Sequence, residues 1–248
     1  MRNDEEIPKD SMEGMGVLSR RQFVKAVAAG IVSAGVWGDV LGSAAVEAAT
    51  STTTPITAAE ALRRLKEGNR RAAAGRFTIV PKLISQRIRS APAQRPFAMM
   101  LSCADSRVPV ELIFDHGFGE LFVVRVAGNT YDDLVEGSFE YAVEHLHVPL
   151  AVVIGHHRCG AVMAAIESVR TGEPAPGHID SLLAPLRPIV RRLGDRPDLL
   201  PAAVEANVRA VVAHLRRDDQ LDEHVASHRL TVVGAVYDLD TGLVQWLS

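Results

Sequence analysis

Four apolar runs of strand length, separated by segments with a helical pattern, constrain the fold of this chain more than any other feature. They span residues 97–101, 121–126, 150–154 and 230–237. The third run is apolar at every position, as expected of a parallel strand that helices cover on both faces. A turn at 240–242 leads into a fifth run, 243–247, which is predicted to be an antiparallel edge strand. The sequence therefore predicts an α/β fold: a central, mainly parallel four-stranded sheet with an antiparallel edge strand and helices on both faces.

The predicted helices alternate with these strands. Thr57 and Glu60 have the spacing of a capping box, and Leu62 and Leu65 then recur at helical spacing until Gly75. Further helical segments are expected at residues 84–91, 109–114, 132–147, 161–171, 179–193 and 202–217. These segments are numerous enough to cover both faces of the sheet.

The first 48 residues have the pattern of an export signal. Arg20 and Arg21 precede an uncharged run that holds only 13 residues before Asp39, and residues 46–48 resemble a cleavage site. A membrane-spanning helix needs about 20 apolar residues, so a cleaved signal is favoured over a retained anchor. Paired arginines before such a run resemble a twin-arginine signal, which predicts a periplasmic or otherwise exported protein.

The chain is expected to comprise a signal peptide at 1–48, a flexible lead-in at 49–56 and one domain at 57–248. Its hydrophobic fraction of 47% is enough for a core of ordinary size. The net charge of −3 gives no basic surface for nucleic acid, and membrane contact is expected only transiently, through the export signal.

Both cysteines of the chain stand just after predicted strands. Cys103 follows the first strand, and His156 and Cys159 follow the third. Parallel strands of an open α/β sheet build their sites at the carboxyl edge, so these side chains are expected to meet there. Two thiolates and an imidazole suit Zn²⁺ and leave a fourth position open, as in catalytic zinc sites. A disulfide, or two inert buried thiols, are the alternatives.

Asp105 and Arg107, two and four residues after Cys103, favour a catalytic role for this site. A carboxylate paired with a guanidinium stays ionised and can accept a hydrogen bond from an attacking nucleophile. The alternative is a surface ion pair worth less than about 1 kcal/mol.

Two segments carry a family resemblance. Cys103-Ala104-Asp105-Ser106-Arg107 and Gly155-His156-His157-Arg158-Cys159-Gly160 resemble the two signature segments of the β-class carbonic anhydrases. The similarity extends through residues 124–129, 137–142 and 233–238, and it covers roughly residues 57 to 248.

This resemblance implies zinc-dependent, reversible hydration of carbon dioxide to bicarbonate and a proton. Cys103, His156 and Cys159 would hold the zinc, and Asp105 could occupy its fourth position in a closed, inactive state. The amide of Gly160, at the start of the helix after Cys159, is a candidate donor to a bicarbonate oxygen. The family's first helix reaches a partner subunit, so a homodimer or tetramer is expected.

Two residues depart from the family pattern. Val126 stands where the family often has Asn, and His157 replaces a small residue, so that it could be a proton shuttle or simply face solvent. Two other functions remain open: hydrolysis of CS₂ or COS on the same scaffold, and a non-catalytic periplasmic zinc or redox protein that uses the two thiols.

Overall fold

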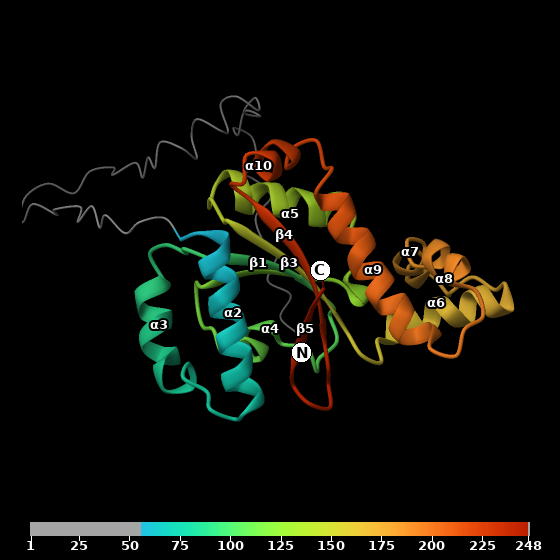
Figure 1. Cartoon of the computed structure of the whole chain (residues 1–248), viewed down its shortest axis with the longest axis horizontal. Coiled ribbons are helices and arrows are strands. Elements are labelled where there is room, and N and C mark those ends of the chain that lie inside the picture. The colour runs from blue at the N-terminus through green and yellow to red at the C-terminus, as the bar shows by residue number, and fades with distance from the viewer. Residues whose placement is uncertain (1–55, 248) are drawn as a thin grey trace, which may run out of the picture. The chain divides into compact units, whose positions relative to one another are not determined.

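In the computed structural model, which describes residues 56–247, helices and strands alternate along the chain (Figure 1). In chain order the elements are α2 (Ala58–Ala73), η1 (Val80–Lys82), α3 (Leu83–Ser90), β1 (Ala98–Ser102), α4 (Val110–Ile113), β2 (Leu121–Arg125), η2 (Ala127–Asn129), α5 (Asp133–Glu144), β3 (Leu150–His156), α6 (Gly160–Thr171), α7 (Ile179–Leu183), α8 (Arg187–Leu193), α9 (Leu199–Leu215), α10 (Asp222–Ala226), β4 (Thr231–Tyr237) and β5 (Val244–Leu247). The predicted export signal at 1–48, and all of the predicted lead-in except residue 56, lie outside the described residues.

The five strands form one sheet in the order β2-β1-β3-β4-β5. β1 pairs in parallel with β2 and β3, β3 pairs in parallel with β4, and β5 is antiparallel to β4. The predicted parallel sheet with an antiparallel edge is therefore confirmed. The order also places β1 and β3 side by side, so the segments that follow them emerge at the same edge.

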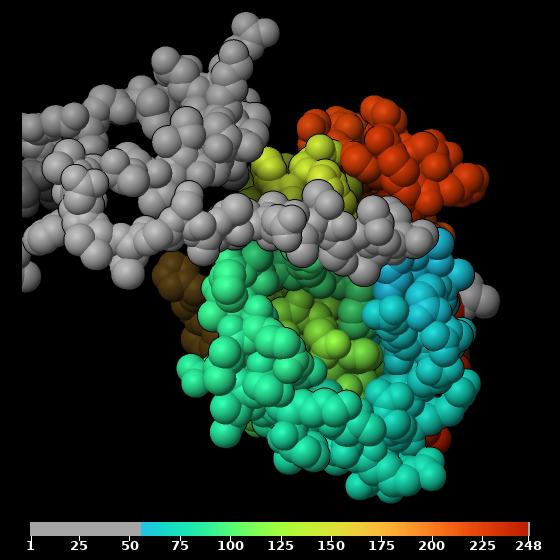
Figure 2. All heavy atoms as spheres, turned by 90° about the vertical axis from the view of Figure 1, so that its left-hand side faces the viewer, coloured from blue at the N-terminus to red at the C-terminus, as the bar shows by residue number. Residues whose placement is uncertain are grey.

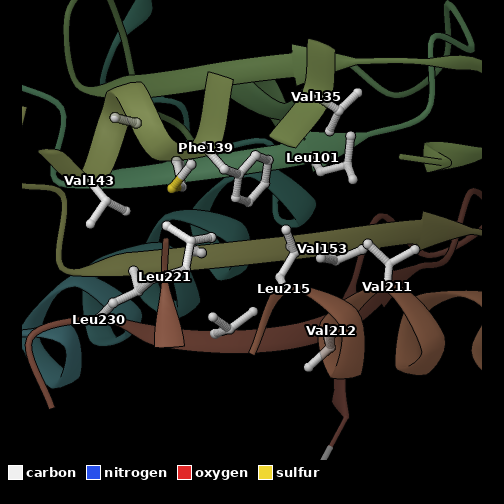
Figure 3. Packing of buried hydrophobic residues seen from close by; sticks show 14 of the residues in the cluster. Leu101, Val135, Phe139, Val143, Val153, Val211, Val212, Leu215, Leu221 and Leu230 are labelled. Carbon is white, nitrogen blue, oxygen red and sulfur yellow. The ribbon is translucent and has the colours of Figure 1, made fainter. Parts of the chain in front are cut away.

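Alternate residues of the buried strands face two separate hydrophobic clusters. Met99 and Leu101 of β1 pack in a cluster with α5 and α9, and Figure 3 shows Phe139 of α5 beside Leu101. Ala98 and Met100 face the opposite side, in a cluster that includes residues of α2 and α4. The sheet is thus covered by helices on both faces, as predicted, because its strands present apolar side chains to each side.

Two glycines let α9 lie close to the middle of the sheet. A Cβ atom at Gly155 of β3 would lie 2.8 Å from Val208, and one at Gly234 of β4 would also lie 2.8 Å from Val208. Neither distance is compatible with an unshifted side chain. The close packing of α9 against β3 and β4 therefore depends on glycine at both positions.

The helix predictions need four corrections. The helix expected at 179–193 is two helices, α7 and α8, because Pro185 lies between them and has no backbone N–H to donate. α5 ends at Glu144 rather than 147, since His147 adopts a left-handed backbone with φ 53°. α9 begins at Leu199 rather than 202, because a proline, here Pro201, is tolerated in a first helical turn. The short helix α10 was not predicted.

The start of α2 has only half of the predicted capping box. The Thr57 hydroxyl accepts a hydrogen bond from the backbone N–H of Glu60 at 3.2 Å, as a cap should. The carboxylate of Glu60, however, pairs with Arg63 and Arg64 instead of reaching back to the cap. Within residues 56–247, no helix has the length and apolar character needed to cross a membrane.

Candidate metal centre and active site

The three predicted metal ligands converge at the carboxyl edge of the sheet. Cys103 follows β1 directly, His156 is the last residue of β3, and Cys159 is the N-cap residue of α6. The two sulfur atoms are 3.9 Å apart, and the sulfurs and an imidazole nitrogen all lie within 4.8 Å of one another. All three side chains are buried, and the thiols are free rather than joined in a disulfide.

The turn between β3 and α6 brings His156 and Cys159 to the same point. Arg158 adopts a left-handed backbone with φ 55°, which bends the chain sharply just before the helix. Its guanidinium holds this turn through two hydrogen bonds of 2.7 and 2.8 Å to the carboxylate of Asp240. The predicted closeness of these two ligands therefore rests on a strained residue between them.

The imidazole of His156 is oriented as a metal ligand requires. Its Nδ1 lies 2.9 Å from the carbonyl oxygen of His157, and because a carbonyl only accepts, Nδ1 carries the proton. In the neutral ring, the lone pair is then on Nε2. That atom is buried and has no hydrogen-bond partner among the described residues. A buried nitrogen left without a partner is costly, so a ligand for Nε2 is expected.

One of the two thiols ionises easily, whereas ionising both is unfavourable. The pKa of Cys103 is lowered to about 4, chiefly by its hydrogen bond with Cys159 and further by His156 and by the N–H of Gly128, although burial opposes the shift. The Gly128 N–H lies 3.2 Å from the Cys103 sulfur. The pKa of Cys159 is raised, because the neighbouring Cys103 sulfur and burial disfavour a second thiolate. A cation between the sulfurs would remove that penalty.

The donor set and its dimensions fit Zn²⁺. Two sulfurs bonded at about 2.3 Å to one tetrahedral ion would lie about 3.8 Å apart, close to the 3.9 Å between Cys103 and Cys159. Two thiolates and a neutral imidazole are soft or borderline ligands, as zinc prefers, and together they neutralise its charge. Three protein ligands leave one position for water or substrate.

Asp105 lies beside this group and is held by Arg107. The guanidinium donates from Nε at 2.9 Å and from Nη2 at 2.7 Å, one bond to each carboxylate oxygen, and the Arg107 backbone N–H adds a third bond of 2.9 Å. These bonds keep the pKa of Asp105 well below its usual range. One Asp105 oxygen lies 3.9 Å from His156 Nε2. The carboxylate is thus ionised, next to the ligand group, and bound to arginine.

Two positioning residues were not identified from the sequence. Arg125 at the end of β2 donates to the backbone oxygens of Cys103 and Asp105, at 3.2 and 2.6 Å. Asn207 of α9 donates at 2.8 Å to the carbonyl of Gly128, whose own N–H contacts the Cys103 sulfur. Gly128 needs a left-handed φ of 75°, which explains the glycine there. The partners are far apart in sequence, so no local motif marks them.

The remaining predicted residues lie around this centre. Gly160 is the exposed first residue of α6, and a Cβ atom there would meet nothing within 4 Å. The ring of His157 is partly exposed and lies 3.4 Å from Asp238. Val126 packs against the hydrophobic cluster under α5, so its side chain offers no polar contact where the family often has Asn.

Comparison with known proteins agrees with this geometry. Residues 98–244 match a family model described as carbonic anhydrase. The chain is 42% identical over 193 residues to carbonic anhydrase 2 of Mycobacterium tuberculosis, which covers 77% of this chain and 91% of that protein. It is 38% identical over 193 residues to the carbonic anhydrase of Mycolicibacterium smegmatis, covering 76% and 92% of the two chains.

Solved structures with a similar fold have the same family name. A Coccomyxa β-carbonic anhydrase in complex with acetazolamide aligns with a TM-score of 0.60 and 30% identity, covering 75% of this chain and 86% of that chain. A tetrameric β-carbonic anhydrase of Sordaria macrospora aligns with a TM-score of 0.59 and 26% identity, covering 73% and 94%. The fold, the paired signature segments and these relatives agree: the chain belongs to the β-carbonic anhydrase family.

Proposed function

We propose that this protein is a zinc-dependent carbonic anhydrase that hydrates carbon dioxide reversibly to bicarbonate and a proton. The observation that carries this proposal is the convergence of Cys103, His156 and Cys159 beside an Asp105 carboxylate held by Arg107. The carbonic anhydrases that it resembles over most of their length support the same activity.

Cys103, His156 and Cys159 would hold the zinc ion. When bound, zinc supplies a Lewis acid that makes water a nucleophile near neutral pH. Arg125 and Asn207 keep the Cys103 segment in place through its backbone and through Gly128. The Cys103 segment is therefore held in position by contacts that do not involve the metal.

Asp105 would orient the nucleophile. Its carboxylate stays ionised beside Arg107, so it would accept a hydrogen bond from an O–H group of the attacking water and turn the lone pair of the water oxygen toward the carbon of CO₂. Arg107 also holds Asp105 in this position, which opposes a closed state in which Asp105 would take the fourth metal position. The Gly160 amide would donate to a bicarbonate oxygen.

The test is metal analysis combined with stopped-flow CO₂ hydration on the mature protein. We expect hydration to fall with zinc content when a chelator removes the metal and to return when zinc is added back. Turnover of CS₂ is measured in parallel. Hydrolysis of CS₂ without hydration of CO₂ would assign the scaffold to the other substrate, and full hydration by the metal-free protein would contradict the zinc proposal.

The protein is also proposed to act as a homodimer or tetramer. The Sordaria macrospora relative is described as tetrameric, which supports self-association. Within the described residues, the apolar stripe of α2 is used inside the chain, since Ala61 and Leu65 are buried in its own core. The neighbouring helix α3 instead exposes Ile84 and Ile88, at 73% and 62%, and a second copy of the chain is the proposed partner for this face.

Export by the twin-arginine route remains a proposal, because it rests on the amino-acid sequence of residues 1–48. Folded export would let the zinc site fill in the cytosol before the two thiols meet an oxidising compartment. We expect the protein in the periplasmic fraction, and we expect it in the cytosol when Arg20→Lys and Arg21→Lys are combined. Periplasmic recovery of that variant would contradict the route.

A further inference from the structure

A second group of ligand-type side chains shares no residue with the first. Glu136 lies on α5, His214 lies in the last turn of α9, and Asp218 follows that helix. One ligand atom from each residue lies within 4.8 Å of the other two. This end of α9 is next to α5 and α10, whereas its other end meets α6 and α8 near Cys159 (Figure 1). The two groups are therefore separate.

The imidazole of His214 is held in a fixed orientation. Its ring stacks on Tyr131, with centroids 3.9 Å apart and planes at 24°. Its Nε2 lies 2.6 Å from a carboxylate oxygen of Glu136. All three side chains are only partly exposed. The geometry thus directs one imidazole nitrogen at a carboxylate without any movement of the ring.

Asp218 contributes a second oriented carboxylate. One of its oxygens accepts hydrogen bonds from the backbone N–H groups of Gln220 and Leu221, which fixes the side chain at the start of the next turn. The other oxygen remains for a ligand. An imidazole with two carboxylates from three different positions is a donor set for a metal ion rather than a simple ion pair.

The surrounding charge favours a cation. Glu140 lies one helical turn after Glu136, and its pKa is raised by burial and then by the negative charges of Asp218, Glu136 and Glu144. Glu136, Glu140 and Asp218 therefore concentrate negative charge beside His214, whereas Glu144 pairs with His224 at 2.6 Å. A divalent ion would relieve this repulsion, and Glu140 could supply a further oxygen.

We propose that Glu136, His214 and Asp218 bind a divalent transition-metal ion, with Zn²⁺ as the best match, at a second metal site distinct from the Cys-His-Cys centre. The ion takes the place of the proton between His214 and Glu136. Because its ligands come from α5 and from the end of α9, it links the two helices that cover one face of the sheet. It stabilises the fold and takes no part in CO₂ hydration.

The test begins with protein that already holds its catalytic zinc. Zn²⁺ is added, and bound metal is measured by equilibrium dialysis with elemental analysis. We expect a second equivalent to bind the wild type and a rise in melting temperature of about 5 °C at saturation. His214→Gln and Glu136→Gln should lose both effects, while the first equivalent and CO₂ hydration persist and show that each variant is folded.

His178→Gln is the matched control, because His178 is an exposed histidine at the start of α7. This variant should bind the second equivalent as the wild type does. The proposal is wrong if the wild type takes up no second equivalent at about 100 µM free zinc, roughly a hundredfold above the Kd of a micromolar site. It is equally wrong if either folded variant of the pair keeps it, since the zinc would then bind elsewhere.

Discussion

At the residue scale, the carboxylate of Asp105 can be tested separately from the metal ligands. Asp105→Asn keeps the size of the side chain but removes the charge that is proposed to accept a hydrogen bond from the nucleophile. We expect CO₂ hydration to fall by about 10²-fold, with zinc content unchanged, because the side chain orients a proton without binding the metal. Stopped-flow hydration and metal analysis on the same sample give the result.

The matched control is Asp198→Asn. Arg196 donates two hydrogen bonds to the Asp198 carboxylate, one to each oxygen at 2.5 and 2.8 Å, as Arg107 does to Asp105. Asp198, however, lies at the start of α9 and is exposed. Removing the Asp198 charge should leave the rate of CO₂ hydration unchanged. If Asp105→Asn hydrates CO₂ at the wild-type rate with full zinc, Asp105 has no part in the reaction, and the proposed role of its carboxylate is wrong.

The sequence was most informative about the positions of residues that a local motif marks. Cys103, Asp105 and Arg107 lie within five residues after one strand, so a motif and a strand end were enough to place them. Arg125 and Asn207 were missed because their hydrogen bonds span 22 and 79 residues. Only the packing of β2 and α9 against the site reveals such partners.

At the element scale, a buried carboxylate joins α2 to the segment before α3. Asp115 follows α4, its side chain is fully buried, and it accepts hydrogen bonds from Arg71 at 2.6 Å and from the hydroxyl and N–H of Thr78, both at 2.8 Å. The Ile79 N–H adds a bond of 3.0 Å. This one side chain therefore satisfies donors from two other segments of the chain, α2 and residues 78–79.

Asp115→Asn should lower the free energy of unfolding by about 3 kcal/mol at pH 7, because the amide cannot accept all of these bonds and leaves Arg71 without its charged partner. Asn tolerates the left-handed backbone at this position, where φ is 52°, so the loss reports on the side chain alone. Urea denaturation of wild type and variant measures this difference in the free energy of unfolding. The exposed Asp195→Asn is the control and should change stability by less than about 0.5 kcal/mol.

The stabilisation by Asp115 should depend on pH. Burial raises the pKa of Asp115, but the hydrogen bonds from Arg71, Thr78 and Ile79 outweigh it, so the folded-state pKa lies below the unfolded value of about 3.9. A lowered pKa contributes stability above the unfolded value, and this is lost as the pH falls through the folded value. The stability difference between wild type and Asp115→Asn should therefore shrink from pH 5 toward pH 2. A constant difference would mean that the charge is not responsible.

At the scale of the whole molecule, the surface around α3 lacks a partner within the described chain. Figure 2 shows this helix on the surface beside α2. Besides Ile84 and Ile88, the preceding segment exposes Phe77 and Val80, at 41% and 56%. Ile84 and Ile88 are four residues apart on α3 and so share one face of this helix, and neighbouring exposed apolar side chains mark an interface more often than scattered ones do. Because the related tetramer points to self-association, a second copy is the expected occupant.

Combining Ile84→Glu with Ile88→Glu should shift the protein toward the monomer, since charges placed at the centre of an apolar contact must be desolvated there. Analytical ultracentrifugation over a range of concentrations measures the shift. Leu134→Glu is the matched control, because Leu134 on α5 is even more exposed, at 82%, but lies away from this face. An unchanged mass for the double variant would exclude α3 from the interface. A mass lowered equally by Leu134→Glu would show that added charge alone, not the loss of this face, separates the subunits.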